Sequence, residues 1–252
     1  MLSNQQVKFI NALSVKKYRQ KYGRFIAEGE KIVSELLKSG YPVDAIYALP
    51  DWLEQHRQML KHNISKFIVQ EVTEAELKKI SQLDSPNKVI AVCPIPETEP
   101  QKEVVEQQVC LVLDEIKDPG NLGTIVRTAD WFGLPYIFCS PSCVDLYNPK
   151  TIQATMGSFL RVKVFYQPLS LLFTQFSDIA VYGAMLNGQN IFDAQCKPPA
   201  FVVIGNEARG ISDEVLPFIQ HSITIPKFGN AESLNAAVAT GIICAWCCLC
   251  PQ

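Results

Sequence analysis

The chain has 252 residues, of which 48% are hydrophobic and 19% are charged, and its formal net charge at pH 7 is −2. This length predicts one large domain or two modest ones with a sizeable core. No apolar run reaches the roughly 18 residues of a membrane-spanning helix, which excludes an integral membrane protein. The nine cysteines follow a polar N-terminus and predict reduced, buried thiols in a cytoplasmic protein.

Positive charge is concentrated near the N-terminus. Residues 1–39 contain eight Lys or Arg and three Glu, which fits a surface facing a polyanion or an ordinary solvated helix face. The segment 14–24 mixes basic residues with Tyr18 and Tyr22, so cations could contact phosphates while the rings stack on unpaired bases. The candidate RNA contacts are Lys16, Lys17, Arg19, Lys21 and Arg24.

Helices and short strands alternate over the first 93 residues. Apolar residues at helical spacing predict helices over 29–38, 52–60 and 73–80, and Thr73 with Glu76 forms a capping box at the start of the third. The predicted strands are 43–49, 66–69 and 89–93. This pattern predicts a small α/β/α domain over residues 1–94. A proline-rich, polar linker follows over residues 95–105.

Residues 106–252 are predicted to form a second domain. Strands are expected over 109–113, 136–139, 162–166, 180–183, 200–204 and 222–225, with helices between most of them. Such alternation predicts an α/β fold with a mostly parallel sheet covered on both faces. The last helix carries one apolar stripe. Its members are Leu234, Val238, Ile242, Ala245 and Leu249.

Three polar loops follow strands of this predicted sheet, over residues 114–121, 205–210 and 225–235. In an open α/β sheet such loops line the carboxyl edge, where ligands bind. The glycine motifs of phosphate-binding loops are absent, and Glu207 in the second loop would repel a pyrophosphate. The loops therefore favour a ligand held by backbone groups and carrying a neutral or cationic part. S-adenosylmethionine, with its sulfonium and adenine, is one such ligand.

Polar residues of these loops are candidates for chemistry, and each has a structural alternative. Arg127 lies among apolar residues, where a buried guanidinium would need an anion or carbonyl groups. The alternative is a salt bridge with one of three nearby acids, namely Asp114, Glu115 and Asp130. Ser233 or a neighbour caps the last helix, and Asn235 needs a hydrogen-bond partner if it is buried.

The cysteines near the C-terminus form a cluster of four. They are Cys244, Cys247, Cys248 and Cys250. Structural zinc sites usually pair two knuckles separated by a dozen or more residues, and this cluster lies on one apolar helix. No metal site is therefore predicted.

At its three loops the chain resembles the SpoU (TrmH) branch of the SPOUT class of RNA methyltransferases. Residues 121–127, Asn-Leu-Gly-Thr-Ile-Val-Arg, resemble the first family motif, Asn-x-Gly-x-Ile-x-Arg. Residues 205–210, Gly-Asn-Glu-Ala-Arg-Gly, are similar to the second, Gly-x-Glu-x-x-Gly. Ile225-Pro226 and residues 233–239 resemble the third. Residues 24–29, Arg-Phe-Ile-Ala-Glu-Gly, resemble more loosely the L30e-like RNA-substrate-binding domain that precedes many of these catalytic domains.

The resemblance implies methyl transfer from S-adenosylmethionine to a ribose 2′-hydroxyl of structured RNA. It implies a homodimer, a trefoil knot in the catalytic domain, and no DNA or membrane partner. The cofactor contacts would be Ile204, Gly205, Asn206, Gly210, Ile225 and Leu234. The reaction centre would be Asn121, Arg127, Glu207, Ser233 and Asn235. Ribosomal RNA is favoured as substrate. The alternatives are transfer RNA, an inactive RNA-binding homologue, an enzyme with an ordinary nucleotide cofactor, and methylation of a base nitrogen.

The role of Arg127 within the centre that the resemblance implies follows from elementary chemistry. A guanidinium is effectively never deprotonated in proteins. We therefore expect Arg127 to stabilise developing negative charge and to hold a phosphate, not to act as a base. Asn121 would orient the nucleotide or Arg127, and Glu207 would fix its own loop and an arginine of the partner subunit.

Overall fold

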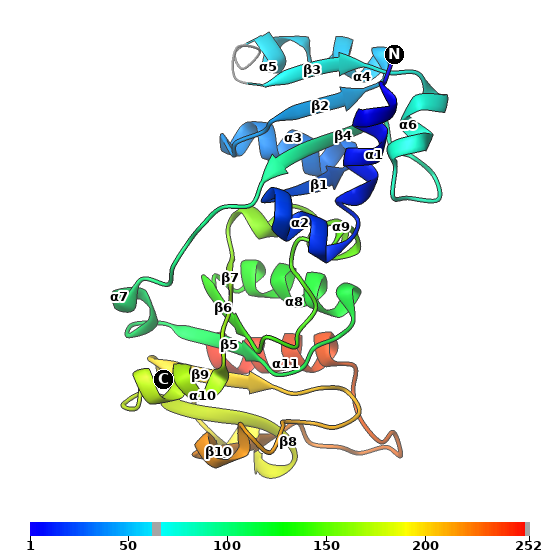
Figure 1. Ribbon diagram of the computed structural model, residues 1–252. Coiled ribbons are helices and arrows are strands. Elements are labelled where there is room, and N and C mark those ends of the chain that lie inside the picture. The colour runs from blue at the N-terminus through cyan, green and yellow to red at the C-terminus, as the bar shows by residue number, and fades with distance from the viewer. Residues whose placement is uncertain (62–66, 250–252) are drawn as a thin grey trace. The chain divides into compact units, whose positions relative to one another are not determined.

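The computed structural model describes residues 1–61 and 67–249 (Figure 1). The chain forms two compact units. The N-terminal unit is Met1–Glu97 together with Tyr147–Leu160, and the C-terminal unit is Thr98–Leu146 together with the chain from Arg161 onward. The chain therefore passes between the units three times, after residues 97, 146 and 160.

A four-stranded mixed sheet forms the centre of the N-terminal unit. Its strands lie in the order β1-β4-β2-β3. They are β1 (Arg24–Glu28), β2 (Ala45–Ala48), β3 (Ile68–Glu71) and β4 (Val89–Pro94). Strand β4 is antiparallel to both β1 and β2, and β2 is parallel to β3. Strand β1 was not predicted, because Phe25–Glu28 is buried on both sides and shows no alternating pattern.

Helices cover this sheet, and their starts follow local capping chemistry. Helix α1 (Asn4–Ala12) begins with a capping box at Ser3, and α6 (Glu74–Ile80) begins with the predicted box of Thr73 and Glu76. Ile10 of α1 and Leu77 of α6 lie in one apolar cluster with the sheet. The other helices of residues 1–61 are α2 (Lys16–Tyr22), α3 (Glu30–Ser39), α4 (Pro50–Gln55) and α5 (Arg57–Lys61). The predicted helix over 52–60 is thus two short helices. Of the predicted strand 66–69, residue 66 lies outside the described residues.

Residues 147–160, which we call the strap, belong to the N-terminal unit although they follow strand β6 of the other unit. The strap contains α9 (Pro149–Thr155) and the short helix η1 (Ser158–Leu160), and α9 packs against β1. The ring of Phe25 on β1 lies 4.7 Å from that of Tyr147 and 5.8 Å from that of Phe159, between centroids. A segment from the second half of the sequence therefore completes the core of the N-terminal unit.

The C-terminal unit has the predicted α/β architecture. Its six strands lie in the order β10-β8-β9-β5-β6-β7, and every neighbouring pair is parallel. In chain order they are β5 (Val109–Leu113), β6 (Tyr136–Cys139), β7 (Lys163–Tyr166), β8 (Ala180–Asn190), β9 (Ala200–Ile204) and β10 (His221–Thr224). Because the strands are buried on both faces, β5, β6 and β9 are continuous apolar runs.

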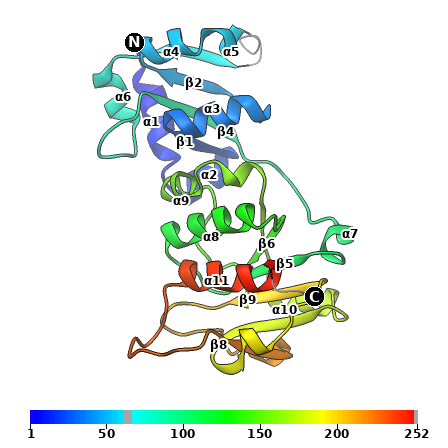
Figure 2. The same cartoon turned by 180° about the vertical axis from the view of Figure 1, so that it is seen from behind.

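Helices lie on both sides of this sheet (Figures 1 and 2). They are α7 (Lys102–Val105), α8 (Pro119–Trp131), α10 (Leu169–Gln175) and α11 (Ala236–Leu249), with the short helices η2 (Ile191–Asp193) and η3 (Leu216–Phe218). Helix α10 shares an apolar cluster with the central strands. Helices α8 and α11 pack against each other. None of the described helices combines the length and the hydropathy needed to cross a bilayer.

Helix α11 is apolar on both of its sides. Its buried side consists of Ala236, Ala237, Thr240, Ile243, Cys244, Trp246 and Cys247. The predicted stripe lies on the other side, where Val238 is 53% exposed and Leu249 is 71% exposed. Periodicity alone could not tell which of the two apolar sides meets the core. The stripe is therefore an outward-facing apolar surface of the single chain.

Candidate functional site

The first and second loops leave neighbouring strands at the same edge of the sheet. Leu113, which ends β5, is paired with Ile204, which ends β9. The next residue, Asp114, donates its backbone N–H to the Ile204 carbonyl at 2.9 Å. The parallel register thus places the Asp114–Asn121 loop beside the loop of residues 205–210, as expected for the carboxyl edge of an α/β sheet.

Helix α8 begins at this edge and presents Asn121 in its first turn. Asp118 caps the helix by accepting the backbone N–H of Asn121 at 2.8 Å, and Pro119 occupies the first helical turn, where its missing N–H is harmless. The Asn121 side chain donates from Nδ2 to Glu207 Oε1 at 2.5 Å. It also accepts at Oδ1 from Asn235 Nδ2 at 2.9 Å. We call these three residues the amide–carboxylate chain.

Asn235 joins the third loop to this chain and also caps α11. Its Oδ1 accepts the backbone N–H groups of Ala237 and Val238 at 2.9 and 3.3 Å. Ser233, the other predicted cap, is exposed and makes no hydrogen bond to another described residue. The cap is therefore Asn235, and one amide side chain both starts the last helix and contacts the first motif.

The second loop closes tightly on itself. Asn206 and Gly210 exchange two backbone hydrogen bonds of 2.9 and 2.8 Å, and Gly210 has the left-handed φ of +72° that favours glycine. A Cβ atom on Gly205 would lie 2.3 Å from the backbone carbon of Gly210, so no other residue fits there without moving the backbone. The loop leaves β9 as a compact hairpin built around Asn206.

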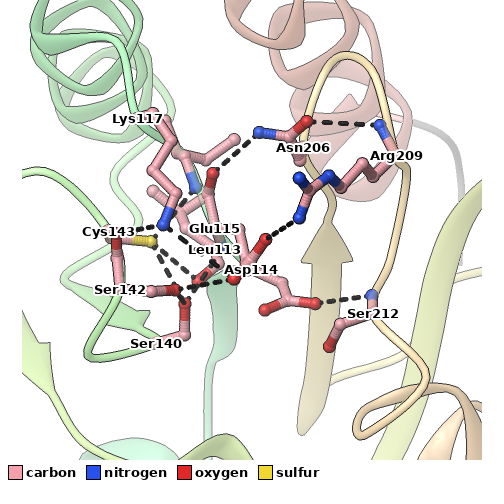
Figure 3. Close-up of polar contacts among 11 residues, drawn as sticks. Leu113, Asp114, Glu115, Lys117, Ser140, Ser142, Cys143, Asn206, Arg209 and Ser212 are labelled. Carbon is pink, nitrogen blue, oxygen red and sulfur yellow. Dashed lines mark hydrogen bonds and ion pairs between the residues drawn. The ribbon is translucent and has the colours of Figure 1, made fainter.

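Further polar contacts, shown in Figure 3, hold the first two loops together. The buried carboxylate of Asp114 accepts the backbone N–H of Ser212 at 2.8 Å. Asn206 donates from Nδ2 to the carbonyl of Glu115 at 3.0 Å, and Glu115 has a φ of +57°. Its carboxylate lies 3.9 Å from the Arg209 guanidinium. Sequence reasoning considered these acids only as salt-bridge partners. The sequence signal for the role of Asp114 in joining the loops was its position directly after the apolar strand β5.

Cys143, which sequence reasoning also missed, lies under the first loop. Its Sγ accepts the backbone N–H of Ile116 and contacts the Leu113 carbonyl, each at 3.3 Å. Hydrogen bonds from the Cys139 thiol, from Ser140 and from Ile116 lower the pKa of Cys143 to about 7 against the opposing effect of burial. Desolvation instead raises the pKa of the neighbouring Cys139 thiol well above its ordinary value.

Arg127 does not have the buried environment that its apolar neighbours predicted. It lies on the exposed side of α8, and its guanidinium makes no hydrogen bond or ion pair with any described residue. The three acids proposed as alternatives have other partners. Asp114 contacts Ser212, Glu115 contacts Lys117 and Arg209, and Asp130 binds Arg161 at 2.7 Å. Helical position decides this, because residue 127 falls outside the buried face of α8, on the same side as the exposed Thr124 and Trp131.

The predicted cofactor contacts differ in environment. Ile204 is buried at the end of β9, while Gly205, Asn206 and Ile225 are half-buried. Leu234 and Gly210 are exposed. The structure thus joins Asn121, Glu207 and Asn235 by hydrogen bonds. It shows no side-chain hydrogen bond within the described residues that ties Arg127 or Ser233 to them.

The predicted RNA contacts in the N-terminal unit fall into two groups. Lys16, Lys17 and Lys21 are exposed on α2. Arg19 is not an RNA contact: its side chain is buried and donates from Nη1 to the carbonyls of Leu13 and Ser14 at 2.9 and 2.8 Å. Helical position decides again, since residue 19 falls on the buried side of the short helix, toward the α1–α2 connection.

Arg24 is partly exposed and forms an ion pair with Asp44. It stays a predicted RNA contact. In the part of the chain that the structure describes, no group of three or more His, Cys, Asp or Glu side chains could hold a metal ion. Cys250, one member of the cysteine cluster, lies outside the described residues.

Two family models match the chain, one in each part of the sequence. The SpoU rRNA Methylase family matches residues 108–245, more than half of the chain, and the MRM3-like substrate binding domain matches residues 4–91. Among curated proteins, the chain is 32% identical over 248 residues to the 23S rRNA (guanosine(2553)-2'-O)-methyltransferase RlmP of Bacillus subtilis, covering 95% of this chain and 94% of that protein.

Solved structures agree with this assignment. A protein assigned to the TrmH family of RNA methyltransferases, from Porphyromonas gingivalis, is 35% identical with a TM-score of 0.85 and covers 98% of both chains. An AdoMet-bound rRNA methyltransferase from Sinorhizobium meliloti is 30% identical with a TM-score of 0.87, covering 98% of this chain and 95% of its own. Together with the three motif loops at one sheet edge, these matches show that the chain belongs to the SpoU rRNA methylase family.

Proposed function

We propose that this chain transfers a methyl group from S-adenosylmethionine to a ribose 2′-hydroxyl of ribosomal RNA. The amide–carboxylate chain is the observation that carries this proposal. It joins Asn121 to residues 86 and 114 positions away in sequence, one from each of the other two motif loops. A relative that matches 95% of this chain carries the same activity in its name.

The second loop fits a ligand held by backbone groups. Its closed hairpin, in which a Cβ on Gly205 would overlap the backbone of Gly210, brings main-chain donors and acceptors to the end of β9. Glu207 makes the loop unsuitable for a polyphosphate. Gly205, Asn206, Ile225 and Leu234 would hold the cofactor, which when bound supplies an activated methyl group on a sulfonium.

The exposed guanidinium of Arg127 suits contact with a substrate. It follows Asn121 by six residues on α8, a rise of about 9 Å along the helix. A ribose hydroxyl becomes a good nucleophile only as it loses its proton, so a fixed cation beside it favours the developing negative charge. Arg127 also presents the planar donors that hold a phosphate. Because a guanidinium keeps its proton in proteins, Arg127 acts through charge and not as a base.

The other members of the centre hold the site in place. Asn121 fixes the relative position of the second and third loops, and Glu207 is held as a hydrogen-bond acceptor by the Asn121 amide. Asn235 starts α11 at a fixed point. Ser233, which is exposed, is free to contact the substrate or the cofactor. These roles complete a centre in which one cation acts on the substrate and three side chains organise the loops.

The N-terminal unit is the RNA-binding domain in this proposal. Its match to the MRM3-like substrate binding domain and the exposed lysines of α2 support that role. Ribosomal RNA is the preferred substrate because full-length relatives act on it by name. The cytoplasmic location and the trefoil knot remain predictions that follow from the family.

A second copy of the chain is the proposed partner of the C-terminal unit. Trp131 at the end of α8 is 85% exposed and Val238 on α11 is 53% exposed, and the two helices pack together. Large apolar side chains exposed on two adjoining helices are typical of a protein interface. Arg127 precedes Trp131 by four residues and so lies on the same side of α8. We expect the wild type to sediment as a dimer and Val238→Glu as a monomer in analytical ultracentrifugation. A monomeric wild type would contradict the homodimer, and an unchanged sedimentation coefficient in the variant would contradict the place of Val238 in the interface.

The activity is tested with labelled S-adenosylmethionine and ribosomal RNA lacking the modification. We expect methyl incorporation by the wild type, and nuclease mapping with mass spectrometry should place the group on a ribose. Arg127→Ala should lower the rate by about 100- to 1000-fold, the usual effect of removing a fixed electrostatic group, with S-adenosylmethionine affinity unchanged by calorimetry.

Arg127→Lys is the matched control for geometry. Lysine keeps the charge but lacks the planar fork, so its activity should stay far below that of the wild type. Full activity of Arg127→Lys would show that bidentate contact is unnecessary. An equal loss of methyl transfer and cofactor affinity in Arg127→Ala would contradict the proposed role. A methyl group found on a base would overturn the proposed reaction.

A further inference from the structure

We propose that helix α2 binds an unpaired segment of RNA, with Tyr18 and Tyr22 stacking on bases and Lys17 and Lys21 contacting phosphates. We call these four residues the α2 platform. This inference rests on the proposed function and specifies its substrate, namely RNA whose unpaired nucleotides contact the N-terminal unit.

The two tyrosine rings form an exposed, ordered surface. Tyr18 and Tyr22 are 38% and 40% exposed, their ring planes differ by 15°, and their centroids are 6.3 Å apart. Phe9 of α1 supports Tyr22 through an edge contact at 5.2 Å. The two rings are stacked and partly exposed, so a base can extend the stack on an open ring face. Every base has a π face, so such a stack binds single strands with little dependence on sequence.

The lysines lie beside the rings in a matching row. Residues four apart in a helix lie on the same side, so Lys17 and Lys21 form a row adjacent to that of Tyr18 and Tyr22. Lys21 Nζ lies 5.4 Å from the centroid of the Tyr22 ring. One row therefore offers cations and the next offers rings, which matches a strand with its phosphates on one side and its bases on the other. Lys16 lies about 100° around the helix from Lys17, on the side away from the tyrosine row.

Arg19 positions this platform. It is buried and bonded to the carbonyls of Leu13 and Ser14, so it fixes α2 to the end of α1. A helix of seven residues is not stable alone, and this anchor gives it a defined orientation before RNA arrives. Contacts that are ordered in advance lose less entropy on binding.

Charge and exposure favour unpaired RNA over other polyanions. Residues 1–27 contain six Lys or Arg and no Asp or Glu, so the segment that holds the platform carries only positive side-chain charge. In a duplex the base faces are stacked inside and cannot reach the rings. An acidic peptide would contact the lysines and leave the ring faces without a partner. The exposed tyrosines therefore favour unpaired RNA over an acidic peptide as the ligand.

The test uses the full chain and two fluorescein-labelled RNAs of equal length. One is a mixed-sequence single strand without self-complementarity, and the other is that strand fully paired with its complement. Fluorescence anisotropy should show tighter binding of the single strand by the wild type. Tyr18→Ala should weaken single-strand binding by roughly 5- to 150-fold, the range for loss of one stacked base, with little change for the duplex. Tyr18→Phe should bind as the wild type does.

The lysine row is tested through salt dependence. Lys17→Ala and Lys21→Ala should each reduce the slope of log affinity against log salt by about 0.7 for the single strand. Lys38→Ala, a matched charge change at an exposed lysine of α3, should leave the slope near its wild-type value. Equal slopes in all three variants, or a change confined to Lys38→Ala, would overturn the assignment of the row.

Folding is checked by circular dichroism and thermal unfolding. Tyr18 is chosen because Tyr22 also supports Phe9. If Tyr18→Ala unfolds, Tyr18→Leu replaces it, since leucine keeps apolar bulk without a π face. If Tyr18→Leu bound the single strand as tightly as Tyr18→Phe, stacking would be contradicted. An equal loss of affinity for the single strand and the duplex in Tyr18→Ala would contradict it as well. If the tyrosine variants bind the RNA probes as tightly as the wild type and retain methyl transfer, the α2 platform is contradicted and the proposed function is not. If the wild type binds the single strand through the tyrosines but transfers no methyl group, the proposed function is contradicted and the platform is not.

Discussion

The amide–carboxylate chain makes Asn121 the most informative residue to change. Asn121→Ala removes the hydrogen bond to the Glu207 carboxylate and the one from Asn235. The first involves a charged group and is worth about 1.5–3 kcal/mol, and the second is worth about 0.5–1.5 kcal/mol. Because Glu207 is half-buried and Asn235 is exposed, water replaces part of both. We expect the free energy of unfolding to fall by about 1–2 kcal/mol.

Activity should fall more than stability in this variant. The second and third loops lose their common contact, and displacement of catalytic groups by an ångström can cost about 100-fold in rate. We therefore expect methyl transfer by Asn121→Ala to drop about 10- to 100-fold. Thr124→Ala, an exposed change on the same helix, serves as control and should have wild-type activity.

Asn121→Asp separates hydrogen bonding from shape. The new carboxylate would face that of Glu207 where an amide now donates, and two carboxylates this close cannot both ionise. The shared proton restores a hydrogen bond as the pH falls. Activity relative to the wild type should therefore rise between pH 8 and pH 6 in Asn121→Asp, whereas the deficit of Asn121→Ala should not change with pH. Identical pH profiles for the two variants, or full activity of either, would refute the organising role of Asn121.

Three further predictions follow from contacts of single residues. Gly205→Ala should lower S-adenosylmethionine affinity at least tenfold by calorimetry, because its Cβ would lie 2.3 Å from the Gly210 backbone; unchanged affinity would place the cofactor away from this loop. Arg19→Ala should lower the free energy of unfolding by about 2–4 kcal/mol in denaturant titrations, since two carbonyls lose a charged donor; a loss of RNA affinity without loss of stability would restore it as an RNA contact. Alkylation of Cys143, followed by peptide mass spectrometry, should increase with pH around its pKa of about 7; a midpoint near 9 would show that the hydrogen bonds from its neighbours do not stabilise the thiolate.

Much of the C-terminal unit could be predicted because its signals are local. The runs 109–113, 136–139 and 200–204 are apolar throughout, as buried parallel strands require, and each is a strand with those bounds. Asp118-Pro119 marks the start of α8 by capping chemistry. The order of strands in an α/β sheet then places the loops that follow them at one edge, which is why the grouping of Asn121, Glu207 and Asn235 could be expected.

The features that could not be predicted depend on which side of a helix is buried and on contacts between residues far apart in the sequence. Arg19 and Lys17 are both basic residues of one short helix, yet one is buried and the other exposed. The composition of the helix does not tell which side meets α1. The same holds for Val238 and Cys244, which lie on opposite sides of an apolar helix. Asp114 was considered only as an ion-pair partner, because its true partner, the Ser212 backbone, lies 98 positions away.

Because of the strap, the N-terminal and C-terminal halves of the sequence cannot be separated without dividing the core of the N-terminal unit. A protein truncated to begin at residue 98 would carry Tyr147 and Phe159 without the Phe25 ring that they contact, and a fragment ending at residue 97 would lack them. A chimera that takes its front half from one relative and its rear half from another would therefore join aromatic surfaces that never evolved together. Exchange of the N-terminal unit between such enzymes requires transplanting residues 147–160 along with the front half.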